Sequence, residues 1–553
     1  MSTTSNRAAA IAPDGLSKYL AAASICGLAL LSYLNILGNG FTLDDFGLIV
    51  HSQAVQSSDW RFLLTNDYWA AFDGRSSGLY RPLTSLFFSL QHALGSGSPI
   101  VFHLCSLLLH ALVSLLVWHL TLPLVGTGAA FMAAALFAVH PAHGEAVAAI
   151  AGQADLLSTC SLMLALLCAW NARFCSGRWS VGTAIFLGIG LLAKEQAIVL
   201  PGLLLALDWY LYKNEKIQCL PWREYAFCAG VILLYLALRY SVLGGWGIGY
   251  IDPLDNPLAG LSTPQRLVQA VVVAWRYLGL LILPYKLSAD YSYNAIPTAD
   301  LFPLALPSLL LMLGAVTLLL YQYLSHPGLR SLSALWMLLA FAPVSNMAFA
   351  IGTIFAERLL YLPSLGFCLV FGVALDQVWN AGQRRLSLMV FALLVLGFMS
   401  RTWVRNGDWH DNETLFRAAT QTYPQSAKAH GGLGQILVDK GDWIGALSEL
   451  ERALSIYPSY AAAHYNQGVA YLSLEQYENA LSAFARAEET NPRHERAALN
   501  SGVALWALER YAEAIAAYER ALIIRPGYAP ALENLHKARS SLNARRAGTT
   551  HGR

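Results

Sequence analysis

The sequence predicts an all-α protein in two parts, a polytopic bundle of membrane helices followed by a C-terminal α-solenoid of repeated helix pairs. Two observations support this prediction. The chain of 553 residues is 56% hydrophobic and only 13% charged, about half the charge content of an ordinary soluble domain. From about Gly407 onward the composition changes to one rich in alanine and charged residues. The net charge of +2 gives no electrostatic reason to expect nucleic-acid binding.

The hydrophobic part predicts eleven membrane spans, each close to the ~20 apolar residues that cross a bilayer. The first run lacks a convincing cleavage site, so we expect a retained span rather than a removed signal peptide. The run 180–212 is too long for one crossing and is interrupted at "AKEQ", which predicts a hairpin with two short legs. The segment 264–284 carries Arg266 and Arg276 along its length and predicts a re-entrant or interfacial helix. The spans are predicted at 18–37, 100–121, 128–141, 156–173, 180–193, 197–212, 221–242, 301–323, 331–350, 359–378 and 386–404.

Positively charged residues predict the two sides of the membrane. They gather between alternate spans, as they do in cytoplasmic loops. Eleven crossings then place the N-terminal tail, residues 1–17, in the cytoplasm and the soluble C-terminal part outside. The basic residues concerned are Arg173, Arg178, Lys213, Lys216, Arg223, Arg330, Arg384 and Arg385.

The soluble part contains a sequence repeat. Gly434, Gly468 and Gly502 are 34 residues apart, and alanine and proline positions recur at the same spacing. This period, with small residues where two helices meet and a proline after the second helix, is typical of tetratricopeptide repeats. Such an array by itself is also compatible with a plain binding scaffold. After a membrane domain at 18–405, the repeat domain at 406–545 is predicted to contain a half repeat at 406–426, repeats at 427–460, 461–494 and 495–528, and a capping helix at 529–545, with a disordered tail at 546–553.

Polar and ionisable residues recur at the span ends and loops that this topology places outside. Charges near a bilayer are costly unless they are solvated, paired or used. Their gathering on one face therefore predicts a functional site there. The residues are Asp44, Asp45, Tyr80, Arg81, His140, His143, Glu145, Asp155, Lys194, Glu195, Asp290, Glu357 and Arg358.

Metal binding is not the favoured interpretation of this group. His140, His143 and Glu145 are spaced so that one helix cannot place all three on one face. The eight cysteines also lack the spacing of a zinc site or a disulfide framework. We therefore assign no metal ligands, and a divalent metal stays open only as an addition to the site.

The segments "FTLDDF", "YRPLTSLFFSLQHAL", "FHLCSLLLHALV", "VHPAHGEAVAAIAGQADLLS", "LLAKEQAIVL", "FAERLLYLPSLGFCL" and "RNGDWHDNETLFRAAT" follow one another in this order. Together they resemble the transmembrane-and-tetratricopeptide O-mannosyltransferases (the TMTC group) of the GT-C glycosyltransferase superfamily, and the alanine-rich composition favours a bacterial member. The resemblance implies a GT-C bundle that transfers a sugar, mannose as first choice, from a polyprenyl-phosphate-linked donor. The acceptor would be a Ser or Thr hydroxyl of a protein, and the transfer would proceed with inversion.

The resemblance also implies a location and partners. The chain would lie in a bacterial inner membrane with periplasmic repeats, or in the ER membrane with lumenal repeats in a eukaryote. The repeats would hold the protein acceptor. Two other functions stay open at this point: a membrane scaffold without catalysis, and transfer to a lipid or cell-wall glycan. A scaffold has no need for the aspartate pair, which separates it from the two enzymatic functions.

The general base is expected at Asp44 or Asp45. In GT-C enzymes the acidic motif of the first external loop has this role, and a carboxylate can take the acceptor proton. The sequence does not decide which of the two aspartates acts as base and which binds acceptor or metal. Two adjacent carboxylates also raise each other's pKa.

The donor phosphate is expected against three cations. Guanidinium groups suit bidentate phosphate binding, although an arginine at a span end also snorkels without a ligand. Lys194 has Glu195 beside it as an alternative partner. The three cations are Arg81, Lys194 and Arg358, and the residues assigned to the sugar or the acceptor are Tyr80, His140, His143, Glu145, Asp155, Glu195, Asp290 and Glu357.

Overall fold

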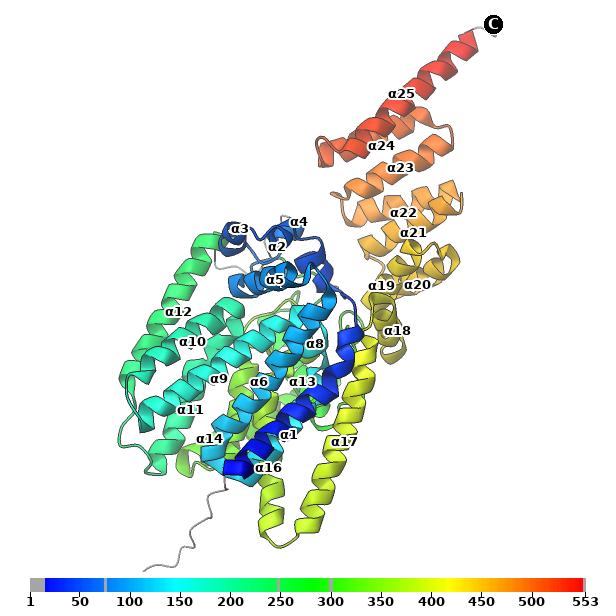
Figure 1. Cartoon of the computed structure of the whole chain (residues 1–553). Helices are drawn as coiled ribbons and strands as arrows, with labels where there is room; N and C mark the ends of the chain where they lie inside the picture. Colours follow the sequence, from blue (N-terminus) through cyan, green and yellow to red (C-terminus); the bar gives the residue numbers. More distant parts are fainter. Residues whose placement is uncertain (1–14, 74–76, 246–248, 298–301, 551–553) are drawn as a thin grey trace, which may run out of the picture.

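The computed structural model describes residues 15–73, 77–245, 249–297 and 302–550, and within these ranges every regular element is a helix. The predicted all-α class is therefore confirmed. Helices α1 to α17 form a bundle, and α18 to α25 extend from one end of it as a column (Figure 1). Most of the predicted N-terminal tail, and residues 551–553 of the predicted disordered tail, lie outside the described residues.

Each predicted span corresponds to a helix. Six helices among the described residues are long and apolar enough to cross a membrane, and four further apolar helices are shorter. The count of eleven crossings therefore stays a prediction, while the apolar bundle suggests an integral membrane protein. The helices are α1 (Gly15–Tyr33), α6 (Pro99–Val125), α7 (Thr127–Val139), α9 (Gln153–Phe174), α10 (Trp179–Ala193), α11 (Leu200–Lys213), α12 (Trp222–Leu243), α14 (Phe302–Ser325), α15 (Leu329–Phe341), α16 (Ser364–Asn380) and α17 (Arg384–Asp408).

The long apolar run breaks between α10 and α11, where the sequence predicted a break. Lys194 has an extended backbone, with φ −158° and ψ 137°, and a 3-10 turn at Glu195–Val199 follows it. The span predicted at 331–350 is shorter than expected. Helix α15 ends at Phe341, since Pro343 just beyond it cannot continue the ladder of backbone hydrogen bonds.

Small residues let two helices of the bundle approach closely. Gly372 of α16 lies against α7, and a Cβ at this position would stand 2.6 Å from the carbonyl oxygen of Ala129. Helix α7 presents a run of alanines to this contact. Membrane helices commonly associate through such small residues, because apolar side chains gain no hydrophobic advantage over lipid.

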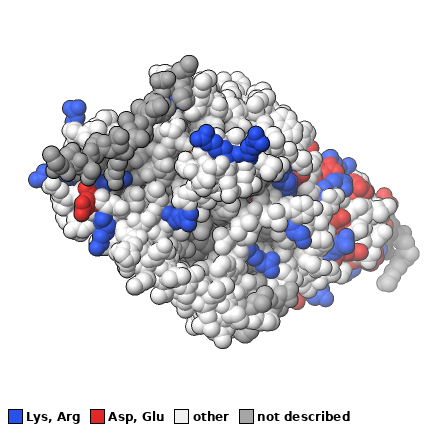
Figure 2. All heavy atoms as spheres, turned by 90° about the horizontal axis from the view of Figure 1, so that it is seen from below, with Lys and Arg blue, Asp and Glu red and all other residues white. Residues whose placement is uncertain are grey.

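The end of the bundle away from the column presents basic side chains and few acidic ones (Figure 2). Some of these cations lie over aromatic rings, Lys213 over Trp209 and Arg384 over Trp379. Aromatic and basic residues are the usual anchors at a membrane interface, and basic residues mark its cytoplasmic side. The orientation of the bundle in the membrane stays a prediction.

Arg173, predicted as a charge of a cytoplasmic loop, is instead buried. Its side chain is 3% exposed and pairs with Asp208 of α11 and with Glu224 of α12, the latter at 2.7 Å from Nη1 to Oε2. A buried cation requires such partners. Arg173 therefore joins α9, α11 and α12 to one another.

The column is the predicted tetratricopeptide array. Glycines at the repeat period let the paired helices meet: a Cβ at Gly468 would stand 2.5 Å from the ring of Phe484, and one at Gly502 would stand 2.4 Å from the ring of Tyr518. Its last helix runs to Thr550, through residues that the sequence assigned to a disordered tail. The helices are α18 (Asn412–Thr422), α19 (Ala427–Asp439), α20 (Trp443–Ile456), α21 (Ala461–Ser473), α22 (Tyr477–Thr490), α23 (Glu495–Ala507), α24 (Tyr511–Ile524) and α25 (Ala529–Thr550).

Short helices cover the end of the bundle that faces the array (Figure 1). The sequence predicted loops for most of this region. The segment predicted as re-entrant or interfacial forms a helix, α13, which is not among the helices long and apolar enough to cross a membrane. The short helices are α2 (Gln53–Gln56), α3 (Trp60–Thr65), α4 (Ala70–Asp73), α5 (Pro82–Gly95) and α8 (Gly144–Ala148), and the longer helix α13 spans Thr263–Ile282.

Compartment reporters will test the orientation of the bundle. A reporter after the exposed Lys216 should lie in the cytoplasm, and one at the C-terminus of the full chain should lie outside, because the basic loops favour the cytoplasmic side. Paired phosphatase and fluorescent-protein fusions measure both positions. Equal signals from both positions would contradict the predicted topology.

Candidate active site

Seven of the predicted site residues come together at the array end of the bundle. Four are carboxylates and three are cations, and they interact through ion pairs or at longer electrostatic range. They come from segments far apart in the sequence. We call this group the charge cluster: Asp44, Arg81, Glu145, Asp155, Lys194, Glu195 and Arg358.

The aspartate pair follows the first span, and its two carboxylates differ in environment. Asp45 is fully buried. Its Oδ2 accepts a hydrogen bond from the backbone N–H of Thr42 at 2.9 Å, and its Oδ1 accepts one from the backbone N–H of Ala151 at 2.8 Å. Burial raises the pKa of Asp45 to about 7, and these two hydrogen bonds oppose the shift. Asp45 therefore ties the loop to the segment that precedes α9.

Asp44 is the accessible carboxylate of the pair. Its side chain is partly exposed, and among the described residues it accepts no hydrogen bond. It lies close enough to Arg358 to interact with it electrostatically. Asp44 thus lies within electrostatic range of the charge cluster and is partly exposed, while its neighbour is used within the fold.

Arg81 makes a bidentate ion pair at the start of α5. Its Nε and Nη2 donate to the two carboxylate oxygens of Glu195, at 2.9 and 2.5 Å. The guanidinium also lies over the ring of Tyr68, 5.4 Å from its centroid. Sequence analysis offered Glu195 as an alternative partner for Lys194, whereas in the structure Glu195 pairs with Arg81.

Lys194, at the break between α10 and α11, forms an ion pair with Asp155 of α9. The Nζ–Oδ1 distance is 2.6 Å, and the side chains are 6% and 2% exposed. The second carboxylate oxygen of Asp155 has no hydrogen-bond partner among the described residues. Such a pair fixes the tip of the helical hairpin against the first turn of α9.

Arg358 is the most accessible of the three cations. Its Nη1 donates to Oε1 of Glu145 at 2.8 Å, and its backbone N–H donates to Oε2 of the same carboxylate at 3.0 Å. Its side chain is 34% exposed, against 14% for Arg81. One edge of the guanidinium is held while the remainder can reach a ligand.

The other predicted site residues lie within the fold. His140 accepts a hydrogen bond from the backbone N–H of Ala142, and His143 contacts the hydroxyl of Ser364 at 2.7 Å; both rings are fully buried. Tyr80 donates its hydroxyl to the carbonyl of Leu64. These three residues therefore make structural contacts instead of joining the charge cluster.

Glu357 is held within the bundle, and Asp290 connects the bundle to the base of the array. Glu357 is fully buried and accepts hydrogen bonds from the hydroxyl of Tyr291 at 2.7 Å and from Arg405. Asp290 accepts a hydrogen bond at 2.5 Å from Ser426, which caps α19. Sequence analysis missed Arg405 because it lies just past the last predicted span. Its only signal was a charge at the end of a long apolar helix.

Among the described residues, no group of three or more His, Cys, Asp or Glu side chains could hold a metal ion. The charge cluster combines three cations with four carboxylates, and each cation forms an ion pair with one of the carboxylates. Such an arrangement can bind an anion through its cations and accept a proton on its accessible carboxylate.

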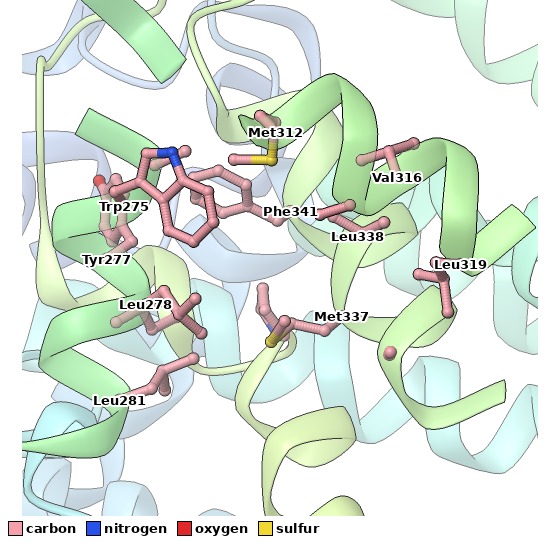
Figure 3. A pocket seen from close by; sticks show the side chains of 15 residues that line it. Trp275, Tyr277, Leu278, Leu281, Met312, Val316, Leu319, Met337, Leu338 and Phe341 are labelled. Carbon is pink, nitrogen blue, oxygen red and sulfur yellow. The ribbon is translucent and has the colours of Figure 1, made fainter. Parts of the chain in front are cut away.

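An apolar cavity of about 190 Å³ lies between α13, α14 and α15, next to the segment that carries Arg358 (Figure 3). Tyr277 in its wall accepts a hydrogen bond from the backbone N–H of Ala356, two residues before Arg358. Helix α14 is almost entirely exposed outside the bundle. The sequence did not predict this cavity. It is lined by Trp275, Tyr277, Leu278, Leu281, Met312, Val316, Leu319, Met337, Leu338, Phe341, Leu360 and Pro363, among others.

Two family models match the chain. Residues 81–240 match dolichyl-phosphate-mannose-protein mannosyltransferase, and residues 401–461, 433–492 and 465–529 match the tetratricopeptide repeat. The first match covers five members of the charge cluster, from Arg81 to Glu195.

Known proteins match over most of the chain. Protein O-mannosyl-transferase TMTC2 of Mus musculus is 30% identical over 513 residues, which covers 75% of this chain and 59% of the relative. Protein O-mannosyl-transferase Tmtc1 of Drosophila melanogaster is 30% identical with the same coverage, and TMTC3 of Homo sapiens is 28% identical over 75% of this chain and 49% of its own length. The chain thus spans between half and three fifths of the length of these relatives.

A solved tetratricopeptide domain, the first of Spaghetti (RPAP3) bound to an HSP90 peptide, is 25% identical to part of the chain. The match covers 22% of this chain and 94% of that domain, with a TM-score of 0.21.

The two aspartates should differ in their effect on stability. Asp45→Ala leaves two buried N–H donors without an acceptor, which costs about 1–3 kcal/mol for each group, so the free energy of unfolding should fall clearly. Asp44→Ala removes no hydrogen bond and should leave it nearly unchanged. Thermal unfolding of both variants in one detergent measures the difference. Equal melting temperatures for Asp45→Ala and the wild type would contradict the structural role of Asp45.

Proposed function

The chain is similar to protein O-mannosyl-transferases over most of its length and itself matches the tetratricopeptide-repeat model, and on this premise we propose that it is a membrane glycosyltransferase. It transfers a sugar, mannose as first choice, from a polyprenyl-phosphate-linked donor to Ser or Thr hydroxyls of a protein. The site faces the periplasm of a bacterial inner membrane, or the ER lumen in a eukaryote. The basic loops at the opposite end of the bundle support this orientation.

The observation that carries the proposal is the partly exposed carboxylate of Asp44 within electrostatic range of Arg358. As the acceptor oxygen attacks the anomeric carbon, its proton passes to Asp44. The bond between that carbon and the phosphate oxygen breaks in the same displacement, so the configuration inverts. The partial exposure of Asp44 and its lack of a hydrogen-bond partner suit a general base; the burial of Asp45 does not.

The cations stabilise the leaving phosphate. Negative charge grows on the phosphate oxygens as the glycosidic bond breaks, and fixed donors aimed at that charge lower the barrier. Arg358 is the first choice because its guanidinium is partly exposed and already oriented by Glu145. Arg81 lies within electrostatic range of it, and the ion pairs of Arg81 with Glu195 and of Lys194 with Asp155 offset the negative charge of those two carboxylates beside it.

The apolar cavity beside Arg358 supports a lipid-linked donor. A polyprenyl chain attached to the phosphate needs an apolar path that begins at the phosphate site and opens to the bilayer. The cavity between α13, α14 and α15 contains aromatic, leucine and methionine side chains and adjoins the exposed helix α14 (Figure 3). Entry from the membrane would place the sugar between Arg358 and Asp44.

The repeats hold the protein acceptor and perform no chemistry. They begin at the end of the last bundle helix, since α18 starts four residues after α17 ends. The first full repeat is fixed to the bundle by the ion pair of Lys428 with Asp255 and by the contact of Ser426 with Asp290. An acceptor bound along the array would therefore have a fixed path to the site.

Asp44→Asn should lower turnover about a hundredfold or more, the usual scale for loss of a positioned base. Asparagine keeps the shape but cannot take the proton, so the affinity for the donor should hardly change. Turnover and donor affinity are both measured with purified protein, labelled polyprenyl-phosphate mannose and a Ser/Thr peptide or periplasmic extract. As a contrast, Arg358→Ala should weaken donor binding, and Arg358→Lys should not fully restore it. Near-normal turnover of Asp44→Asn would exclude Asp44 as the base.

Deleting residues 461–528 should separate acceptor choice from chemistry. The deletion removes two whole repeats, so α25 follows the first repeat in the register it has after the third. Transfer to a short peptide should persist, while transfer to a protein acceptor should fall about tenfold or more, equivalent to ~1.4 kcal/mol of lost binding. Both rates are measured on samples with matched donor binding. An equal fall for both acceptors would argue against a role of the repeats in acceptor choice.

A further inference from the structure

The segment that joins the bundle to the array contacts the loop that carries the aspartate pair. We call residues 405–412 the root segment. The backbone N–H of Gly40 donates to the carbonyl of His410 at 2.9 Å, and the side-chain amide of Asn39 donates to the carbonyl of Asn406 at 3.0 Å. The backbone N–H of Leu43 donates to Oδ1 of Asn412 at 2.8 Å. Three contacts thus connect the root segment to the residues that lead into Asp44.

The last of these contacts holds an unusual backbone. Leu43 has φ +45°, in the left-handed region that residues with a Cβ rarely adopt. Such a conformation persists only where the surroundings impose it. The hydrogen bond to Asn412 fixes the N–H of Leu43 itself, one residue before Asp44. The direction in which Asp44 leaves the loop therefore depends on the Asn412 side chain.

Asn412 is itself held by the array. It is the first residue of α18, and the next residue, Glu413, pairs with Arg417 on its own helix and with Lys440 at the end of α19. At the other end of the root segment, Arg405 contacts Glu357, the neighbour of Arg358. The root segment thus touches a residue next to the base and a residue next to the phosphate ligand.

We propose that Asn412 is a positioning residue of the transfer reaction, acting through Leu43 on the carboxylate of Asp44. This inference rests on the proposed function. The base of the array then supplies a part of the active site without touching substrate. An array that only recruited acceptors would have no effect on transfer to a peptide too short to reach the repeats.

The effect should appear in turnover rather than in binding. A shift of about 1 Å in a reacting group can cost about a hundredfold in rate. Asn412→Ala in the full-length chain should lower kcat for a short Ser/Thr peptide about ten- to hundredfold. The KM values for the peptide and for labelled polyprenyl-phosphate mannose should change less than about twofold. Asn412→Asp keeps an acceptor oxygen at the same place and should retain most of the turnover.

A second variant separates positioning from general destabilisation. Glycine adopts the left-handed conformation without steric cost, so Leu43→Gly should restore part of the kcat lost in Asn412→Ala. Loss of α18 packing would not be repaired by this change. Asn500→Ala is the matched control: it removes a half-buried asparagine of the array that contacts Tyr465, and its kcat should equal that of the wild type.

The outcomes distinguish the two proposals. A wild type that transfers no sugar overturns the proposed function and this inference with it. A wild type that transfers sugar, together with normal kcat in Asn412→Ala, overturns the inference alone. Equal losses in Asn412→Ala and Asn412→Asp, or a loss in Asn412→Ala that Leu43→Gly does not reduce, also overturn it.

Discussion

Charge beside a bilayer must be neutralised, and the arrangement of the candidate site depends on how the chain meets this requirement. Each cation of the charge cluster has a carboxylate partner from a distant segment: Glu195 for Arg81, Asp155 for Lys194 and Glu145 for Arg358. In the buried pair of Lys194 with Asp155, removing one member leaves an uncompensated charge, which costs about 3–5 kcal/mol; the other two pairs are partly exposed. The pairs therefore fix α5, α8, α9 and the break between α10 and α11 around one point. A site prepared in this way needs little rearrangement when an anion arrives.

Most of the fold could be predicted from the sequence, because its signals are local. Apolar runs gave the helices of the bundle, the polar interruption at Lys194 gave the break in the hairpin, and the glycine period gave the array. The short helices over the array end could not be predicted, since packing against the bundle decides them more than their own composition. The helical end of α25 was missed for a similar reason: a polar, charged segment carries little apolar signal.

The candidate site was predictable as a set of residues but not as a set of pairs. Lys194 and Glu195 are neighbours in sequence, yet their extended and 3-10 backbones send the side chains to different partners. Asp44 and Asp45 are also neighbours, and only the tertiary contact with Ala151 distinguishes the buried carboxylate from the accessible one. His140 and His143 were chosen for their chemistry, but burial makes them part of the interior. Pairing and burial are properties of contacts between distant segments, which one sequence does not display.

The array has a consequence for how such a protein can change over time. Its full repeats have one length, each contacts mainly its neighbours, and among the described residues the first of them is fastened to the bundle through Ser426 and Lys428. Whole units can therefore be duplicated or lost before the terminal helix α25 without moving the root segment or the charge cluster. The length and surface of the array can then vary independently of the chemistry, so one membrane domain could serve different protein acceptors when the number of repeats above it changes.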